Sequence, residues 1–398
     1  MKGRRLVAVL CLTEVLGMAG FGTFAALLPT FRAEWALSNI AAGWIEGAFQ
    51  AGYLAGVPLL VGLTDRVDPR RIYLAAMAVS AVASVAFALL ATGLWSACLF
   101  RALAGFGLAG TYMPGLRLLS DRLEGPGQSR AVAFYTASFS VGVSLSVLLA
   151  GTLNEAMGWR AAFGLAGACA ATALVIAAAS LRRARSAPSP AQSPVSVLDF
   201  RPVLANRKAL GYSLGYAAHM WELFGLRAWI VAFLVFAIAR TDDELPAGVS
   251  ATDAAALILV LALPASLLGN EASLRFGRRR TLLAVMSLSA VLAGLVGLSA
   301  ALPPLAMLAV LAVYGAVVGA DSASLTAGAV AAARPGQQGL TMSFHTLIGF
   351  AAAAVSPLAF GAVLDLGGDG SIASWWLAFA VLGLGVALGP LCLWRMRV

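Results

Sequence analysis

The sequence has 398 residues, of which 61% are hydrophobic and only 11% are charged. A soluble core of this size cannot absorb so many apolar side chains, so the composition excludes an ordinary soluble enzyme and indicates a membrane protein. The formal net charge of +9 does not indicate a nucleic-acid partner, because the basic residues lie between apolar segments and form no soluble basic surface.

Apolar segments of about 20 residues, long enough to cross a hydrocarbon layer of about 30 Å, recur along the whole chain. They predict an all-α membrane protein with twelve transmembrane helices. The first segment follows Lys2 and Arg4 but is too long, and lacks the cleavage site, for a secretory signal, so we expect it to remain as a helix. The predicted spans are 6–30, 42–63, 72–93, 95–117, 131–153, 160–181, 209–237, 253–274, 281–301, 304–329, 340–364 and 372–394.

The basic residues predict the orientation of these helices. With the amino terminus inside, all but five of the 27 lysines and arginines fall in cytoplasmic loops. The exceptions are Arg32, Arg160 and Arg240 outside, and Arg101 and Arg227 within spans. Such an excess is typical of cytoplasmic loops. We therefore expect a multi-pass protein of the cytoplasmic (inner) membrane, with both termini in the cytoplasm.

The twelve spans divide into two similar halves. Residues 182–208 form the longest polar segment and the only one rich in proline and serine, so they are predicted to be a linker between bundles 1–181 and 209–398. At an offset of 208 to 210 residues, TEVLGM (13–18) matches WELFGL (221–226), and GPGQSRAVAFYT (125–136) matches RPGQQGLTMSFHT (334–346). The matches place Glu14 opposite Glu222, and Tyr135 opposite His345.

Two six-helix halves repeated about an axis along the membrane normal resemble the major facilitator superfamily. The loop after the second span also resembles the family pattern G-x-L-x-D-R-x-G-R-R. The segment VGLTDRVDPRR has Val61 and Asp68 at the glycine positions and one additional residue, Pro69. It keeps the charged positions, Asp65, Arg66, Arg70 and Arg71.

The resemblance implies a cytoplasmic gate built from this loop. Asp65 would face the amino end of the eleventh helix, where the helix dipole favours an anion, and would close the cytoplasmic side in the outward-facing state. Arg70 and Arg71 belong to the same loop. Asp121, at the end of the fourth span, would join this cluster together with Arg66.

The fourth span adds a second resemblance. LFRALAGFGLAG is similar to the family pattern R-x-x-x-G-x-G, with Arg101, Gly105 and Gly107 in register. In relatives that exchange solutes for protons, this arginine holds a carboxylate network beside the cavity. The G-P pair typical of the fifth helix in drug/proton antiporters is absent from SFSVGVSLSVLLAG, which argues against a multidrug antiporter but not against transport.

Six charged residues within predicted spans are candidates for a function, because a charge at the bilayer centre costs at least about 2.5 to 3.5 kcal/mol. They are Glu14, Glu46, Arg101, Glu222, Arg227 and Asp321. The resemblance implies that the first, fourth, seventh and tenth helices line a central cavity, and these helices carry all but Glu46. A carboxyl group surrounded by hydrocarbon holds its proton more tightly than one in water. Glu222 and Glu14 are therefore candidates for proton coupling, and structural hydrogen bonding by neighbouring helices is the alternative.

The other candidates have similarly open roles. His219 lies on the same helical face as Glu222 and could hydrogen-bond or tune it, or simply pack. Arg227 lies about 140° around the helix from Glu222 and about 7 Å further outward, where it is either a substrate or gate contact or an interfacial anchor. Arg101 and Glu46 are at similar depth, which favours an ion pair.

Three polar residues remain near the predicted cavity. Asp321, among Ser322, Ser324 and Thr326, either lines the cavity or hydrogen-bonds between helices. Tyr135 and His345, at matching positions, are candidate substrate or gate contacts. The alternative for His345 is a packing role. Met342, three residues before it, is not enough to predict a metal site. The four cysteines lie in separate spans and predict neither a disulfide nor a zinc site.

Without a phosphate-binding GxxxxGK[ST] or a catalytic triad, we expect neither an enzyme nor a cofactor. The sequence predicts a monomeric secondary transporter for a small organic solute, coupled to protons. The alternatives are an efflux carrier for amphiphilic drugs or metabolites, favoured by Trp221, Phe224 and Trp229 beside the acids, a channel, or a non-transporting sensor, which would need an appended soluble domain. Substrate identity and direction stay open.

Overall fold

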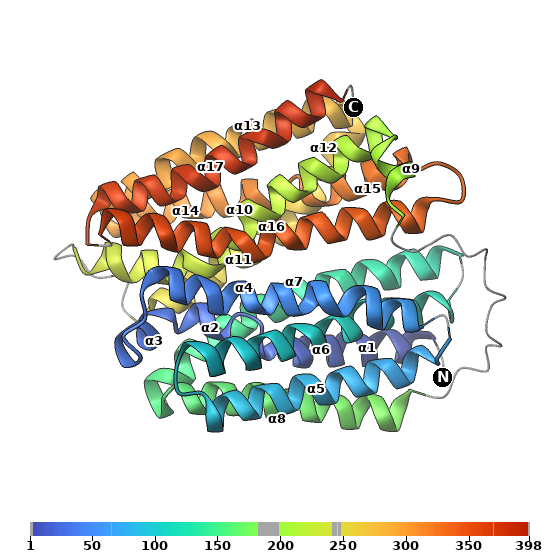
Figure 1. The fold of residues 1–398 in the computed structure, drawn as a ribbon, viewed down its shortest axis with the longest axis horizontal. Helices are drawn as coiled ribbons and strands as arrows, with labels where there is room; N and C mark the ends of the chain where they lie inside the picture. The colour runs from blue at the N-terminus through green and yellow to red at the C-terminus, as the bar shows by residue number, and fades with distance from the viewer. Residues whose placement is uncertain are drawn as a thin grey trace. The chain divides into compact units, whose positions relative to one another are not determined.

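The computed structural model describes residues 3–64, 66–123, 125–181, 199–240, 245, 248–368 and 370–396. Within these ranges the chain forms helices and no β-strand, which confirms the predicted all-α class (Figure 1). Asp65 and most of the predicted linker, residues 182–198, lie outside the described residues. The predicted bundle boundaries at 181 and 209 stay a prediction.

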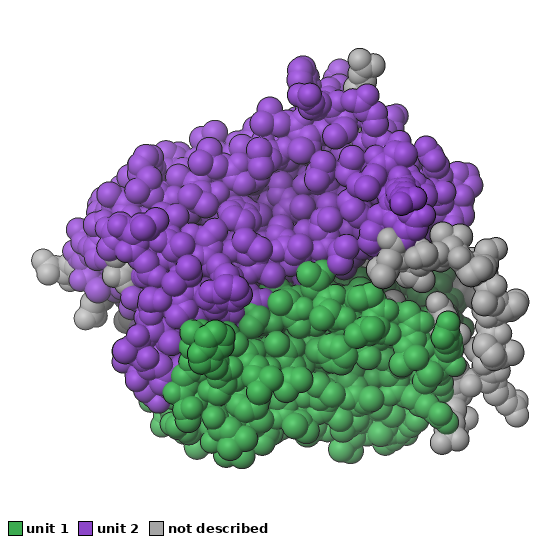
Figure 2. Space-filling model, viewed as in Figure 1, with its two compact units in different colours: residues 1–30, 48–194 green, residues 31–47, 195–398 purple. Residues whose placement is uncertain are grey.

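The chain divides into two compact units (Figure 2). Unit 1 comprises residues 1–30 and 48–194, and unit 2 comprises residues 31–47 and 195–398. The grouping of residues 31–47 with the second half of the chain was not expected from the sequence. Because α3 (Leu28–Glu34) and α4 (Asn39–Gly56) cross these limits, α4 begins in unit 2 and ends in unit 1.

Unit 1 contains the following further elements: α1 (Gly3–Gly17), η1 (Met18–Gly20), α2 (Thr23–Ala26), η2 (Val57–Val61), α5 (Pro69–Leu90), α6 (Leu94–Ser120), α7 (Gly125–Met157) and α8 (Trp159–Ser180). The first predicted span is thus interrupted after Gly17. Inside a membrane, every backbone polar group of such an interruption needs a partner within the protein. The hydroxyl of Ser146 on α7 supplies one, because it accepts a hydrogen bond from the amide of Gly22 at 2.9 Å.

Unit 2 contains α9 (Arg201–Leu204), α10 (Arg207–Ile238), α11 (Ala251–Val260), α12 (Ala262–Phe276), α13 (Arg278–Val296), η3 (Gly297–Ala301), α14 (Pro304–Gly319), α15 (Ser322–Ala332), α16 (Gln338–Gly367) and α17 (Ile372–Arg395). α10 is the most enclosed of the membrane-length helices, with 72% of its apolar window buried against at most 56% in the others. His219 and Glu222, in the middle of α10, are therefore deep inside unit 2.

Ten of the predicted spans are helices long and apolar enough to cross a membrane. The count of twelve is not confirmed within the described residues, because two spans differ. Span 6–30 is divided into α1, η1, α2 and α3, and span 42–63 corresponds to α4 and η2, where Glu46 and Gln50 lower the hydropathy. Both departures involve polar or glycine-rich sequence within otherwise apolar segments.

The residues that depart from the family loop pattern start α5. Asp68 is its N-cap and accepts a hydrogen bond from the amide of Arg70 at 3.0 Å, and Pro69 occupies the first turn, where no amide donor is needed. Arg70 in turn donates to the carbonyls of Leu181 at 2.6 Å and Ala178 at 2.8 Å, at the carboxyl end of α8. A cation at that end is favoured by the helix dipole, so the loop ties α5 to α8.

The glycines of the fourth span allow helix backbones to touch. A Cβ added to Gly105 on α6 would meet the carbonyl of Phe49 on α4, and one added to Gly52 on α4 would meet the carbonyl of Ala102 on α6. Small residues at helix crossings permit such close approach in membranes. The second half of α4 is therefore packed directly against α6 within unit 1.

Replacing Gly105 tests this packing. We expect Gly105→Ala to lower the melting temperature in detergent, because overpacking costs about 1 to 3 kcal/mol. Gly164 on α8 is the matched control, since nothing lies within 4 Å of a Cβ added there. Gly164→Ala should be neutral or stabilising by up to about 1 kcal/mol, the usual gain in a helix interior. Equal melting of the two variants would contradict the contact between α4 and α6.

Candidate functional site

The carboxyl group of Glu222 lies on α10 and is held by two further helices of unit 2. Its side chain is 1% exposed. The hydroxyl of Ser289 on α13 lies 2.9 and 2.8 Å from its two oxygens, and the hydroxyl of Tyr314 on α14 donates to Oε1 at 3.0 Å. Among the described residues, no lysine, arginine or histidine lies within ion-pair distance. The acid is therefore satisfied by neutral hydroxyls alone.

Glu14 on α1 has a comparable setting in unit 1. It is also 1% exposed, and the hydroxyl of Tyr135 on α7 donates to its Oε2 at 2.8 Å. Its Oε1 has no hydrogen-bond partner in the described part of the chain. Beside it, Thr13 pairs with the hydroxyl of Tyr73 on α5 at 2.8 Å. As at Glu222, no basic residue within the described ranges neutralises this acid.

The two acids occupy matching repeat positions, but their tyrosine partners do not. Tyr135 lies on the fifth predicted span and Tyr314 on the tenth. His345, which the repeat places opposite Tyr135, stacks on Tyr216 with ring centroids 3.9 Å apart, and its Nε2 lies 3.5 Å from the Thr326 hydroxyl. Each acid is thus bonded to a tyrosine hydroxyl, but the tyrosines come from helices that do not match in the repeat.

Among the described residues His219 makes no hydrogen bond to Glu222, which was one of its predicted roles. Its Nδ1 lies 2.7 Å from Oδ1 of Asp321, and both side chains are buried. Neither atom meets the geometry of a hydrogen bond with any other described group. The physical reason is that Asp321, at the junction of α14 and α15, lies beside His219, whereas Glu222 one turn further along α10 meets α13 and α14. Asp321 thus makes a contact between helices.

Arg101 on α6 binds the interruption of the first span. Its guanidinium donates to the carbonyls of Gly20 and Phe21 at 3.0 to 3.2 Å and lies 4.4 Å from the centroid of the Phe49 ring. The side chain is fully buried. Glu46 is buried too, on the part of α4 that belongs to unit 2. The ion pair between Arg101 and Glu46 joins residues of different units and stays a prediction.

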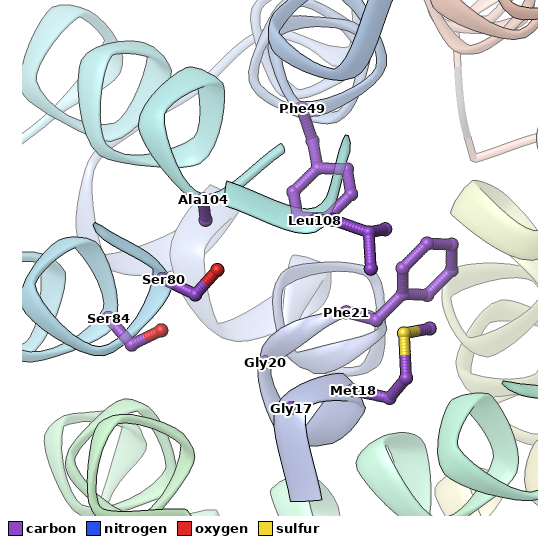
Figure 3. Close-up of a pocket in the computed structure, with 9 residues that line it drawn as sticks. All are labelled: Gly17, Met18, Gly20, Phe21, Phe49, Ser80, Ser84, Ala104 and Leu108. Carbon is purple, nitrogen blue, oxygen red and sulfur yellow. The ribbon is translucent and has the colours of Figure 1, made fainter. Parts of the chain in front are cut away.

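A cavity of about 20 Å³ lies in unit 1 beside this interruption. It is lined by Gly17, Gly20 and Phe21 on one side and by Ser80 and Ser84 of α5 on the other. Figure 3 shows the two serine hydroxyls pointing toward the interrupted segment. The volume holds about one water molecule, so this cavity is too small for an organic solute.

The remaining candidates have contacts that leave their predicted roles open. Arg227 is half-buried, with its guanidinium 5.2 Å from the centroid of the Phe224 ring. In the predicted cytoplasmic gate, Asp121 lies 3.6 Å from Arg117 on the same helix, and Arg66 and Arg71 are exposed. The bonds of Arg70 and Asp121 lie within unit 1, and the gate stays a prediction because Asp65 lies outside the described residues.

Sequence reasoning missed the hydroxyl groups that satisfy the acids. Ser289 and Tyr314 lie in apolar spans, where a serine hydroxyl often bonds to its own helix backbone instead. One signal was available. A buried carboxyl group requires hydrogen-bond donors, so hydroxyls on neighbouring spans had to be considered. The sequence does not say which span supplies them, because this depends on how each helix is rotated.

The family model described as Major Facilitator Superfamily matches residues 10–241, more than half of the chain. The chain belongs to the Major Facilitator Superfamily. This confirms the family resemblance of the loop after the second span and of the fourth span. As a family member with ten apolar helices of membrane length among its described residues, it is a multi-pass membrane protein.

Several curated proteins are similar to parts of this facilitator. The niacin transporter NiaP of Acinetobacter baylyi is 24% identical over 146 residues, which are 37% of this chain and 33% of that protein. The protein spinster homolog 1 of Bos taurus is 25% identical over 289 residues, 69% of this chain and 55% of that protein. The multidrug resistance protein Stp of Mycobacterium tuberculosis is 26% identical over 137 residues, 34% of this chain and 25% of that protein. The chain thus spans at most 55% of the length of these three.

Solved structures share the fold over nearly the whole chain. A bacterial homologue of the human lysosomal transporter Spinster superposes with a TM-score of 0.79 at 15% identity, covering 99% of this chain and 96% of that one. The nucleoside transporter NupG has a TM-score of 0.75 at 13% identity, covering 100% and 99%. At these identities the likeness shows the fold of the facilitator and no more.

The hydroxyl bonds of Glu222 can be tested through stability. We expect Ser289→Ala to lower the melting temperature in detergent, because a hydrogen bond to an ionised or strongly polar buried group contributes about 1.5 to 3 kcal/mol. The effect should shrink when Glu222→Gln is already present. Ser287→Ala is the matched control, since Ser287 is exposed on the same helix. Equal melting of the two serine variants would contradict the contact.

Proposed function

We propose that this facilitator is a secondary active transporter that moves a small organic solute across the cytoplasmic membrane by alternating access, coupled to protons at Glu222 and Glu14. One observation carries the proposal. Two carboxyl groups at matching positions of the repeat are fully buried and are held by hydroxyls, with no basic partner among the described residues.

Hydroxyl partners suit a group that gains and loses a proton. The hydroxyls of Ser289 and Tyr314 can donate to a carboxylate or accept from a carboxylic acid, because each is both donor and acceptor. A lysine or arginine partner would instead hold the carboxyl group ionised. Glu222 therefore keeps hydrogen bonds to both hydroxyls in either protonation state, and neither state requires the helices to separate.

Transport itself is supported by the family and by the names of relatives. Facilitators are built as two repeats that rock about a site near the membrane midplane. NiaP, Spinster and NupG are described as transporters. The sequence has no phosphate-binding motif for ATP, which favours a gradient as the energy source. We also propose an inner-membrane monomer with both termini in the cytoplasm, on the basis of the loop charges.

A small polar solute is a better proposal than a cationic amphiphile. Trp221 and Trp229, two of the three aromatic residues that favoured an amphiphile, take part in packing within unit 2. The indole of Trp229 is fully buried and donates to the carbonyl of Pro357 at 3.1 Å, and that of Trp221 donates to the carbonyl of Val381 at 3.3 Å. The ring of Trp229 also stacks on Phe360 with centroids 5.3 Å apart, so it is not available to stack on a ligand.

A panel of solutes in proteoliposomes tests the substrate class. We would compare radiolabelled niacin as a small anion, uridine as a neutral polar solute and ethidium as a cationic amphiphile, with and without an imposed proton gradient. Gradient-driven accumulation of niacin or uridine is expected. Accumulation of ethidium alone would favour the efflux carrier, and downhill flux without counterflow of labelled solute would indicate a channel.

Neutralising Glu222 tests the coupling. We expect Glu222→Gln to fold and to exchange solute down its gradient, because exchange need not move a proton, but to lose both proton-driven accumulation and the pH dependence of transport. Glu155→Gln is the matched control, since Glu155 is exposed at the end of α7. If Glu222→Gln accumulates solute with the wild-type pH profile, the coupling role is wrong, and Glu14 and Asp321 become the acids to test.

A further inference from the structure

We propose that Asp365 is a latch that holds the amino end of α4 against α16 and releases it when the side predicted to face outward opens. The carboxyl group of Asp365 accepts three hydrogen bonds from the start of α4: from the amide and the side-chain amide of Asn39, both at 2.9 Å, and from the amide of Ile40 at 2.8 Å. These residues all belong to unit 2.

The position of Asp365 in its own helix indicates that the side chain is stabilised by α4 and not by α16. It lies in the last turn of α16, where the helix dipole disfavours an acid. The amino end of α4 has the opposite polarity and offers amide donors that have no partner within the helix. Ser38 caps the next amide, that of Ala41, at 3.2 Å. The start of α4 is thus satisfied partly by its own sequence and partly by another helix.

Glycines bring the two helices into backbone contact below the latch. A Cβ added to Gly43 or Gly47 of α4 would meet the carbonyls of Pro357 and Ala354 on α16, and one added to Gly361 of α16 would meet the carbonyl of Asn39. Gly43 and Gly47 are four residues apart, the spacing that lets membrane helices approach closely. The same face of α16 ends at Asp365, one turn beyond Gly361.

α4 is fastened differently at its two ends. Its first half packs on α16 in unit 2, and its second half packs on α6 in unit 1 through Gly52 and Gly105. The inference rests on the proposed alternating access, in which the two bundles move against each other. A continuous helix that is bound to both bundles cannot move with both of them. One of its two contacts therefore has to break.

The contact with α16 is the one built to release. Asp365 is exposed, whereas Asn39 beside it is buried. Water can therefore replace the carboxylate bonds at the solvent edge of the pair, whereas Gly52 and Gly105, where α4 meets α6, are both buried. The exposed charge also makes the latch sensitive to salt, because exposed charge interactions are screened at high ionic strength.

Pulsed electron paramagnetic resonance tests the latch without a substrate. Spin labels would be placed at Trp44 on α4 and Val355 on α16, which are 55% and 54% exposed, in a background where Cys11, Cys98, Cys169 and Cys392 are replaced by alanine. In detergent we expect one distance population with Asp365 intact, and a second, longer population in Asp365→Ala. Asp365→Asn, which keeps the shape, should give a smaller fraction of the longer distance, and so should Asn39→Ala.

Asp253→Ala is the matched control, because Asp253 caps α11 in the same unit through Ser250 and touches no second helix with that cap. It should leave the distance distribution unchanged. Identical distributions for wild type, Asp365→Ala and Asp365→Asn would overturn the latch, and so would an equal shift in Asp253→Ala. If Asp365→Ala separates the labels while proteoliposomes carry no solute of the panel, the latch stands and the transport proposal fails.

Discussion

A carboxyl group that is buried among apolar helices, and whose hydrogen-bond partners within the described residues are hydroxyls, is the constraint on which this structure depends. Glu222 is on the most enclosed helix of unit 2 and meets Ser289 and Tyr314 from two other helices. A buried polar group without partners costs several kcal/mol in an apolar medium, so the packing of α10, α13 and α14 is tied to satisfying this acid. Glu14 imposes the same requirement on α1 and α7.

The two halves meet a second constraint, the satisfaction of backbone groups inside the membrane, in different ways. α10 is an unbroken helix of 32 residues, so its amides and carbonyls bond within it. Its counterpart in the first half is interrupted after Gly17, and Arg101 and Ser146 supply the partners that the helix lost. The position of the acid is therefore the same in both halves, but the helix that carries it is continuous in one half and interrupted in the other.

The sequence predicted what hydropathy and charge determine. Ten spans, the all-α class and the burial of Glu14, Glu222 and Asp321 follow from the cost of placing polar groups among apolar ones. The partners did not follow, because helix rotation is absent from a hydropathy pattern. His219 was assigned to Glu222 by spacing along one helix, and the nearer acid, Asp321, comes from another. Asp365 lies just beyond the predicted span 340–364, and the sequence gives no sign of its partner because Asn39 is more than 300 residues away in sequence.

Infrared difference spectroscopy of the carboxyl stretch of Glu222 tests the central claim most directly, because it observes the proton itself. Membrane-reconstituted protein would be titrated in parallel with Glu222→Gln and with Glu155→Gln as the exposed control. The expected result is a protonated-carboxyl band that appears and disappears over the titration in wild type and in Glu155→Gln, and that is weaker in Glu222→Gln, where only the contribution of Glu14 remains. A titration with no such band in wild type, or with a band of the same strength in Glu222→Gln, would contradict a proton carried by Glu222.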